Sequence, residues 1–208
     1  MLALAALIFG VVYILLTLVV RALMQRHRTG DTGIRYLSLP PGSTQWWSHW
    51  TFVIGIGLTA IAAPIAGLAG LAPIRMLEHP ISQGLGVTLA VLGIFGVFIA
   101  QLMMGPSWRI AVDEAERTEL VTTGAFGVVR NPIFTAMATT FLGLPLMLPN
   151  VLAVVGLAAA VIAMQIQVRL VEEPYLHRVH AASYDDYASR VGRFLPGIGR
   201  LRPRLPDS

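Results

Sequence analysis

The sequence contains no cysteine and no lysine. The missing cysteine excludes disulfide bonds, thiolate metal sites, iron–sulfur clusters and cysteine nucleophiles. The missing lysine excludes a Schiff-base lysine and the lysine of a phosphate-binding P-loop. All fifteen basic residues are therefore arginine, and a net charge of +4 is too small to favour nucleic acid as a partner.

Charge of either sign is scarce. Only 12% of the 208 residues are charged, 55% are hydrophobic, and the mean hydropathy is +0.69. Soluble domains carry about 25% charged residues. A chain this short with half that charge cannot cover a soluble surface, so we expect an integral membrane protein.

Five apolar runs approach the roughly 20 residues that a bilayer-spanning helix needs. They cover Leu2–Val20, about Thr51–Leu71, about Gly84–Met104, Ile133–Leu148 and Val151–Val171. The expected fold is therefore all-α, with about five transmembrane helices. Only Pro149-Asn150 separates the last two runs, which predicts an antiparallel hairpin. The fourth run is short, roughly 24 Å as a helix, and its full crossing of the bilayer stays open.

The arginines are distributed unevenly among the loops. Fourteen of fifteen fall on one side of a five-helix model, and Arg75 alone falls on the other. By the positive-inside rule the amino terminus lies outside and the carboxyl terminus in the cytosol. The first run has no positive charge before it, which favours a retained helix over a cleaved signal peptide. The Ala- and Arg-rich composition points to a bacterial inner membrane.

Three regions follow from this pattern. Residues 1–106 hold the first three helices with a cytosolic loop at 21–50, residues 107–196 hold the polar motifs, and residues 197–208 form a basic, proline-rich tail. Trp46, Trp47 and Trp50 begin the second helix, as an interfacial aromatic belt would.

A first polar cluster runs from Leu120 to Phe134. In Asn131-Pro132, asparagine is a good helix cap and proline fits the first helical position, which predicts a helix start. This explanation leaves Arg130 at the membrane surface without a role, so function and topology stay equally open for that residue.

A second cluster is Glu172-Glu173-Pro174, directly after the fifth run. Two carboxylates at a helix carboxyl end are unfavourable, and Pro174 disfavours helical geometry at Glu173. We therefore expect the helix to break there and the pair to bind a cation or hydroxyl groups. Neutralisation by Arg169 is the alternative.

Beyond it, residues 184–196 read as an amphipathic helix and turn that lies on the membrane face or covers the site as a lid. The five histidines cluster only as His177 and His180, without carboxylate partners, so no metal site is expected.

Taken together, these motifs resemble the isoprenylcysteine carboxyl methyltransferase and phospholipid methyltransferase superfamily. The resemblance rests on Leu120 to Phe134, on Glu172-Glu173-Pro174-Tyr175-Leu176 after the apolar hairpin, and on Tyr184 to Pro196. It covers roughly Arg109 to Pro196. Asn131 stands where many members have histidine, and Phe134 where many have tyrosine.

The resemblance implies a membrane enzyme that moves a methyl group from S-adenosylmethionine to a lipophilic acceptor entering from the bilayer. It implies cofactor contacts from Leu120, Val121, Gly124, Phe126, Asn131, Pro132, Phe134, Glu172 and Glu173. We expect Arg130, Arg169 and Glu172 to be catalytic, and Arg169, Arg193 and Tyr187 to contact the acceptor. A carboxylate acceptor needs no general base, and an arginine can hold its charge.

Two other functions stay open. One is an NADPH-dependent reductase of the sterol type on a similar scaffold, and the other is a non-catalytic membrane assembly protein. Neither the identity of the acceptor nor the oligomeric state can be read from the sequence.

Overall fold

The computed structural model describes residues 1–112 and 119–201. Several residues of the predicted polar stretch and tail lie outside this part of the chain: Asp113, Glu114, Glu116, Arg117, Arg202 and Arg204. The described chain is helical throughout its long elements. Four helices are long and apolar enough to cross a membrane: Leu2–Thr29, Thr44–Leu68, Pro80–Ser107 and Val151–Arg190.

Three of these four rods are composite. Each changes from α-helical to the wider π-helical hydrogen-bonding pattern for six residues and then continues. The first rod joins α1 (Leu2–Ile14) through the π turn Leu15–Val20 to α2 (Arg21–Thr29). The second joins α3 (Thr44–Ile56) through Gly57–Ala62 to α4 (Ala63–Leu68). The last joins α8 (Val151–Ile166) through Gln167–Glu172 to α9 (Glu173–Arg190).

The remaining helices are simpler. They are α5 (Pro80–Met104), the four-residue α6 (Ala125–Val128) and α7 (Pro132–Met147). The predicted all-α fold with about five membrane helices is thus confirmed, with α7 as the shorter apolar helix. Short 3₁₀ turns lie at Tyr36–Ser38, Arg75–Leu77 and Gly105–Ser107.

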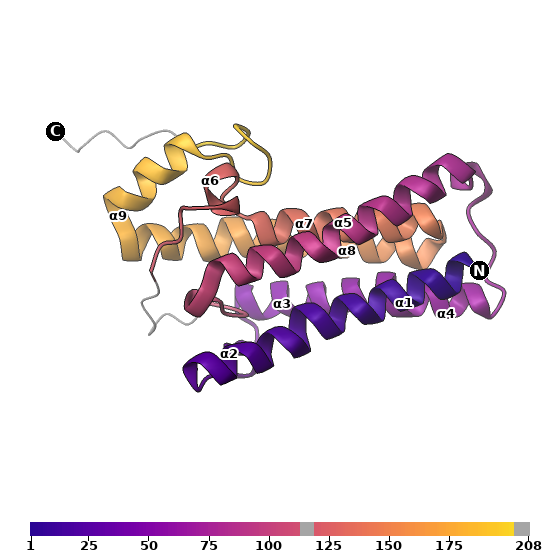
Figure 1. Cartoon of the computed structure of the whole chain (residues 1–208), viewed down its shortest axis with the longest axis horizontal. Coiled ribbons are helices and arrows are strands. Elements are labelled where there is room, and N and C mark those ends of the chain that lie inside the picture. The colour runs from indigo at the N-terminus through magenta and orange to yellow at the C-terminus, as the bar shows by residue number, and fades with distance from the viewer. Residues whose placement is uncertain (113–118, 202–208) are drawn as a thin grey trace.

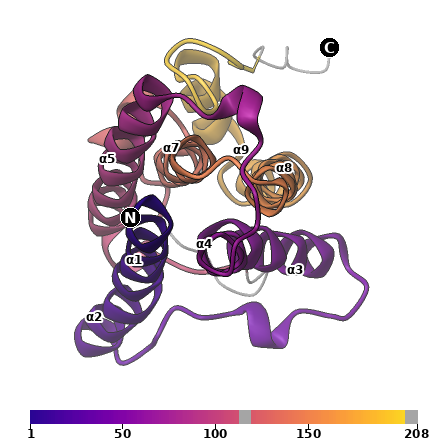
Figure 2. The same ribbon diagram turned by 90° about the vertical axis from the view of Figure 1, so that its right-hand side faces the viewer.

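The short helix α7 occupies the middle of the bundle. It lies between α5 and α8 in Figure 2, and α1 lies below it in both views (Figures 1 and 2). Its neighbours approach closely because small residues face each other: a Cβ added to Gly86 of α5 would come within 2.7 Å of the Gly143 carbonyl oxygen of α7. Small residues are the usual means of close helix packing in membranes.

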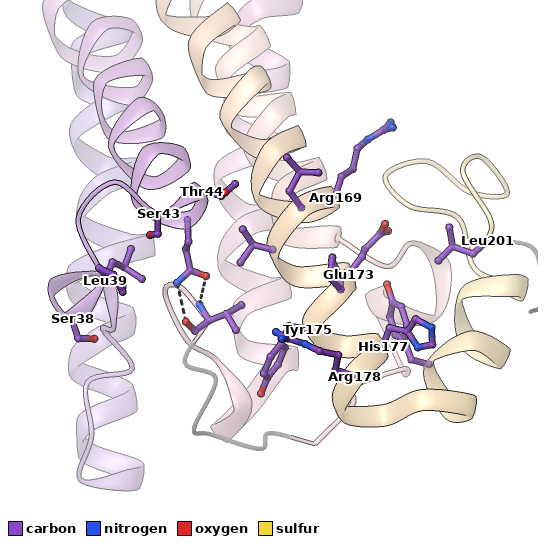
Figure 3. Close-up of a pocket in the computed structure, with 17 residues that line it drawn as sticks. Ser38, Leu39, Ser43, Thr44, Arg169, Glu173, Tyr175, His177, Arg178 and Leu201 are labelled. Carbon is purple, nitrogen blue, oxygen red and sulfur yellow. Dashed lines mark hydrogen bonds between the residues drawn. The ribbon is translucent and has the colours of Figure 1, made fainter.

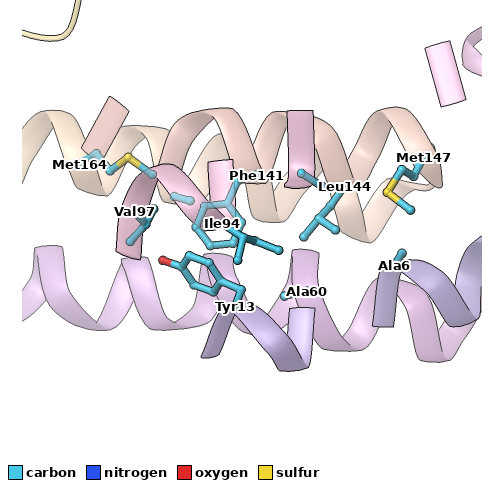
Figure 4. Close-up of a cluster of buried hydrophobic side chains, with 11 residues drawn as sticks. Ala6, Tyr13, Ala60, Ile94, Val97, Phe141, Leu144, Met147 and Met164 are labelled. Atoms are coloured by element: carbon cyan, nitrogen blue, oxygen red, sulfur yellow. The ribbon is translucent and has the colours of Figure 1, made fainter. Parts of the chain in front are cut away.

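A buried apolar cluster joins these helices along their length (Figure 4). Tyr13 of α1 packs edge-on against Phe141 of α7, with ring centroids 5.1 Å apart. Ile94 and Val97 of α5 and Met164 of α8 complete this part of the cluster. The core therefore holds helices from both halves of the chain in one bundle.

The predicted hairpin between α7 and α8 is present, and Asn150 fixes it. Its side-chain oxygen accepts a hydrogen bond from the Ala153 amide (3.0 Å), which caps α8, and its amide group donates to the Ala63 carbonyl (3.0 Å). The turn is thereby tied to α4 at the same end of the bundle.

The two ends of the bundle differ in charge. The amino terminus lies at the end opposite α6 and α9 (Figure 1), and Arg75 follows α4 at that same end. The other described arginines belong to segments at or near the α6–α9 end. The amino terminus and α9 lie at opposite ends of the bundle (Figure 1), as an odd number of crossings requires. The assignment of the arginine-rich end to the cytosol stays a prediction.

The expectation of a helix break at Pro174 is wrong. Glu173 has helical dihedral angles (φ −61°, ψ −44°), and α8 passes into α9 without interruption. A π turn directly precedes Pro174, and its wider hydrogen-bonding pattern accommodates a proline that has no amide hydrogen. The bend lies further on, at Ala181, where φ is +42° and ψ is −118°.

Candidate functional site

A cavity of about 560 Å³ lies among all five membrane helices, a volume within the range of small-molecule sites. Most of its wall is apolar. Ten of the thirteen predicted site residues line it: Leu120, Val121, Phe126, Arg130, Asn131, Pro132, Phe134, Glu172, Glu173 and Tyr187. The predicted residues Gly124, Arg169 and Arg193 are not part of its wall.

Glu172 is a carboxylate on the cavity wall at the end of the π turn of the last rod. Its described hydrogen-bond partner is the amide of Gln167, at 3.3 Å in the same turn. No arginine pairs with it in the described chain. A polar wall group with so little internal compensation is suited to a ligand that brings a cation or hydroxyl donors.

Glu173, by contrast, is held by two arginines. Its Oε1 accepts from Arg130 (2.8 Å) and from Nε of Arg193 (2.7 Å), and its Oε2 accepts from the other arm of Arg193 (2.8 Å). Hydrogen bonding to this carboxylate raises the pKa of the Arg193 guanidinium above its usual range. Glu173 therefore fastens the segment after α9 to the bundle.

Arg130 is buried and also caps α9. Its guanidinium donates to the carbonyls of Ala188 (3.0 Å) and Val191 (2.6 Å) and to that of Gly199 (3.1 Å). A cation at a helix carboxyl end interacts favourably with the helix dipole. The side chain is thus committed to holding the carboxyl end of α9, which borders the cavity through Tyr184 and Tyr187.

Asn131 begins α7, as predicted, but its side chain does not cap that helix. Its backbone and side-chain amides both donate to the Arg193 carbonyl (3.1 Å each). The predicted capping bond is therefore wrong, because the side chain is oriented by its donation to the Arg193 carbonyl and its oxygen accepts no bond from the helix amides. Pro132 occupies the first helical position as expected.

Both α9 and the segment after it are bound at further points. The Tyr187 hydroxyl donates to the Phe126 carbonyl (2.6 Å), and Thr135 of α7 donates to the Phe194 carbonyl (2.8 Å). Tyr187 packs with Tyr184 and Leu120 in a small apolar cluster. Through Leu176, Tyr184 and Tyr187, α9 forms one end of the cavity, and the segment after it lies outside the cavity wall.

Arg169 lies apart from the cavity. Its side chain is exposed and donates to Gln165 (2.8 Å), so its predicted alternative role as the partner of Glu172 or Glu173 is not realised. It lines an outer groove of about 1160 Å³ between the loop before α3 and the helix around Pro174 (Figure 3). Glu173 and Tyr184 border both the groove and the cavity.

The amino-terminal half supplies a large share of the cavity wall, which the sequence motifs do not predict. Polar and aromatic members of this wall are Tyr13, Thr17, Tyr36, Ser48, His49, Trp50, Phe52, Gln101, Trp108 and Arg109. All three π turns border the cavity, through Thr17, Gly57 and Gln167 with Glu172. π-Helical turns frequently occur at functional sites.

Within residues 1–112 and 119–201, no group of three or more histidine, aspartate or glutamate side chains is placed to hold a metal ion. The expectation that no metal is used stays a prediction.

Membrane-length helices around a largely apolar cavity with a few polar wall groups define an integral membrane protein that can bind an amphipathic small molecule. Residues 81–183 match the family described as phospholipid methyltransferase, and the chain belongs to this family of membrane methyltransferases. The match runs from α5 to just past the bend in α9, so it includes both motifs and the hairpin. The resemblance noted in the sequence is thereby confirmed.

A curated relative is the nickel-cobalt-cadmium resistance protein NccN of Alcaligenes xylosoxydans xylosoxydans. It is 29% identical over 119 residues, which cover 57% of this chain and 54% of the relative. The similarity thus spans about half the length of either protein. No solved structure matches the chain significantly.

Proposed function

We propose that this protein transfers a methyl group from S-adenosylmethionine to a lipophilic acceptor, most favourably a carboxylate as in isoprenylcysteine carboxyl methylation. The observation that carries the proposal is the single cavity in which the family's motif residues meet apolar helices of the amino-terminal half. Such a cavity offers polar contacts for a nucleoside and apolar wall for a lipid tail.

The residues present fit the cofactor. Glu172 is a carboxylate on the wall with one weak internal partner, suited to an ammonium group or ribose hydroxyls. Ile133 and Phe134 line the cavity in the first turn of α7, where the free amides of a helix amino terminus favour a carboxylate. The cofactor supplies an electrophilic methyl group: its carbon–sulfur bond breaks as the carbon–oxygen bond to the acceptor forms, leaving a thioether.

The protein's own contribution is to hold two reactants together and to exclude water. Fixing two reactants in line supplies about 7–11 kcal/mol of a reaction barrier. Arg130 and Glu173 fasten the end of α9, which borders the cavity through Tyr184 and Tyr187, so we assign Glu173 a positioning role and Glu172 the cofactor contact. We further propose that the arginine-rich end faces the cytosol, where the cofactor is found.

The activity is tested with membranes that contain the protein and with methyl-labelled S-adenosylmethionine. We expect label in the lipid extract, released by mild base as methanol because a methyl ester is formed. Label that resists mild base would indicate an amine acceptor instead of a carboxylate. Absence of label from lipid, with the cofactor intact, would contradict the proposed transfer.

Glu172→Gln tests the site. The substitution removes the charge but keeps the shape, so we expect S-adenosylhomocysteine to bind at least about tenfold more weakly, or about 1.4 kcal/mol. Calorimetric titration of purified protein measures this, with Glu78→Gln at the opposite end of the bundle as the matched control. Unchanged binding in Glu172→Gln would refute the assignment. Binding of NADPH in place of S-adenosylhomocysteine would favour a reductase.

A further inference from the structure

Arg21 is a buried cation in the amino-terminal half of the bundle. Only 1% of its surface is exposed. Its guanidinium donates to the Gln25 side chain (2.9 Å) and to the carbonyls of Gln101 (3.3 Å) and Gly105 (2.8 Å), and it lies 4.5 Å from the centroid of the Trp108 ring. It therefore caps the carboxyl end of α5.

These contacts supply hydrogen-bond partners to the Arg21 guanidinium, but none of them supplies a negative charge. No carboxylate among the described residues pairs with Arg21, and the charged neighbours that act on it are Arg28 and Arg109, both cations. A buried charge is costly unless an opposite charge compensates it. The positive charge beside Trp108 is therefore available to a ligand.

The surroundings of Arg21 open onto the cavity. Thr17, Gln101 and Trp108 all line it. The Gln101 amide donates to the Thr17 carbonyl (3.0 Å), while its side-chain oxygen is buried and has no partner among the described residues. Next to this end of the cavity there is thus a cation that no described carboxylate compensates, together with a polar atom that no described group binds.

The carboxyl-terminal arginines are placed differently. The guanidinium groups of Arg130 and Arg193 both bind Glu173, and Arg169 lies in the outer groove. They were the predicted partners of an acceptor carboxylate. Among the described arginines, Arg109 lines the cavity wall at its Trp108 end, and Arg21 lies against the Trp108 ring.

We propose that the cavity end formed by Thr17, Gln101 and Trp108 binds an anionic amphiphile, whose oxyanion head is attracted by the buried charge of Arg21. The apolar wall formed by the π turn of the first rod and by α3 then receives its tail, through residues such as Leu18, Trp50 and Val53. That this amphiphile is the methyl acceptor rests on the proposed function, but its binding requires no methyl transfer. The head is a carboxylate or a phosphate, which share this chemistry.

The test compares three ligands with one tail: dodecanoate, dodecyl phosphate and dodecanol. They are titrated into the purified full chain in a neutral detergent, and dissociation constants are measured. A unit charge several ångströms away in a partly buried site is worth about tenfold or more in affinity. We expect at least one anion to bind about tenfold more tightly than dodecanol, and the better anion identifies the head group.

Arg21→Gln should reduce this preference to about twofold or less, whereas Arg21→Lys, which keeps the charge, should retain most of it. Arg75→Gln, an exposed arginine at the opposite end, is the control that should leave the preference unchanged. Gln101→Glu places a negative charge beside Arg21 and keeps the arginine, so it should also abolish the preference even if Arg21→Gln fails to fold.

The outcomes separate this inference from the proposed function. Equal binding of anions and dodecanol by a protein that binds S-adenosylhomocysteine overturns the inference alone. A preference that depends on Arg21, in a protein that does not bind S-adenosylhomocysteine, supports the anion site and contradicts the methyltransferase. A preference that survives both Arg21→Gln and Gln101→Glu overturns the assignment to Arg21.

Discussion

Arg130 and Arg21 do the same structural work in the two halves of the chain, in opposite electrostatic settings. Each is buried, each caps the carboxyl end of a helix, and each leaves its Nε without a partner among the described residues. Arg130 binds the carboxylate of Glu173, whereas the partners of Arg21 among the described residues are carbonyls, an amide and an aromatic ring. One charge is compensated by a carboxylate, and the other has no carboxylate partner within residues 1–112 and 119–201.

The two arginines therefore differ in role: Arg130 holds a segment of the chain in place, and Arg21 can attract a ligand. A buried ion pair with satisfied hydrogen bonds fixes a segment in place, and losing one partner strands the other. A buried cation without an anion stabilises the fold less, but it leaves an attraction for an external anion. Replacing Arg130 should therefore lower the stability more, whereas replacing Arg21 should lower the affinity for an anionic ligand more.

The largest expected effect on stability is that of Arg130→Gln. It removes one of two cations from Glu173 and leaves three carbonyls short of a donor, so we expect a loss of about 3 kcal/mol. Unfolding of the detergent-purified protein measures it. Arg190→Gln is the matched control, because Arg190 pairs with Asp186 on the surface and such pairs are worth about 0–1 kcal/mol. Equal losses of stability in both variants would contradict the structural role assigned to the buried Arg130–Glu173 pair.

Arg21→Gln should cost less, about 1 kcal/mol, because glutamine keeps a polar group at the end of α5 and no carboxylate is stranded. The same unfolding measurement applies. A loss as large as that of Arg130→Gln would show that Arg21 is primarily structural, and the comparison would fail.

The smallest effect is expected at the bend that brings α9 to Arg130. Ala181 has a positive φ of 42°, which glycine adopts with less strain, so Ala181→Gly should be neutral or stabilising by up to about 1 kcal/mol. Its exposed, helical neighbour Ala182 is the control, since Ala182→Gly should destabilise by about 0.5–1 kcal/mol. A similar loss at both positions would mean that the bend is not strained.

Hydropathy predicts the fold well because the bilayer imposes it. The five runs correspond to the observed helices, and the hairpin at Pro149-Asn150 follows from the two-residue gap. The helices extend beyond the apolar runs to Thr29 and Arg190, since helix formation does not stop where lipid contact stops. The π turns could not be predicted, because a shift in hydrogen-bonding partner leaves no mark on hydropathy.

The candidate site is predictable only in part. The motif residues gather around one cavity, but sequence distance hides the contribution of α1, α3 and α5 to the same wall. Thr17 and Gln101 are single polar residues within apolar runs, and nothing in their spacing marks them. Arg21 reads as a topology signal at the end of the first run, and only its burial without a carboxylate distinguishes it from the other arginines.

The π turn Gln167–Glu172 also sets the rotation of everything that follows it. A π turn takes up about one residue more than an α turn, so winding the same residues as regular α-helix would rotate α9 about its axis by roughly 100°. Tyr184 and Tyr187 would then leave their cluster, and Glu173 would face away from both of its arginines. The extra residue that this π turn takes up thus sets the rotation of α9 relative to the membrane bundle.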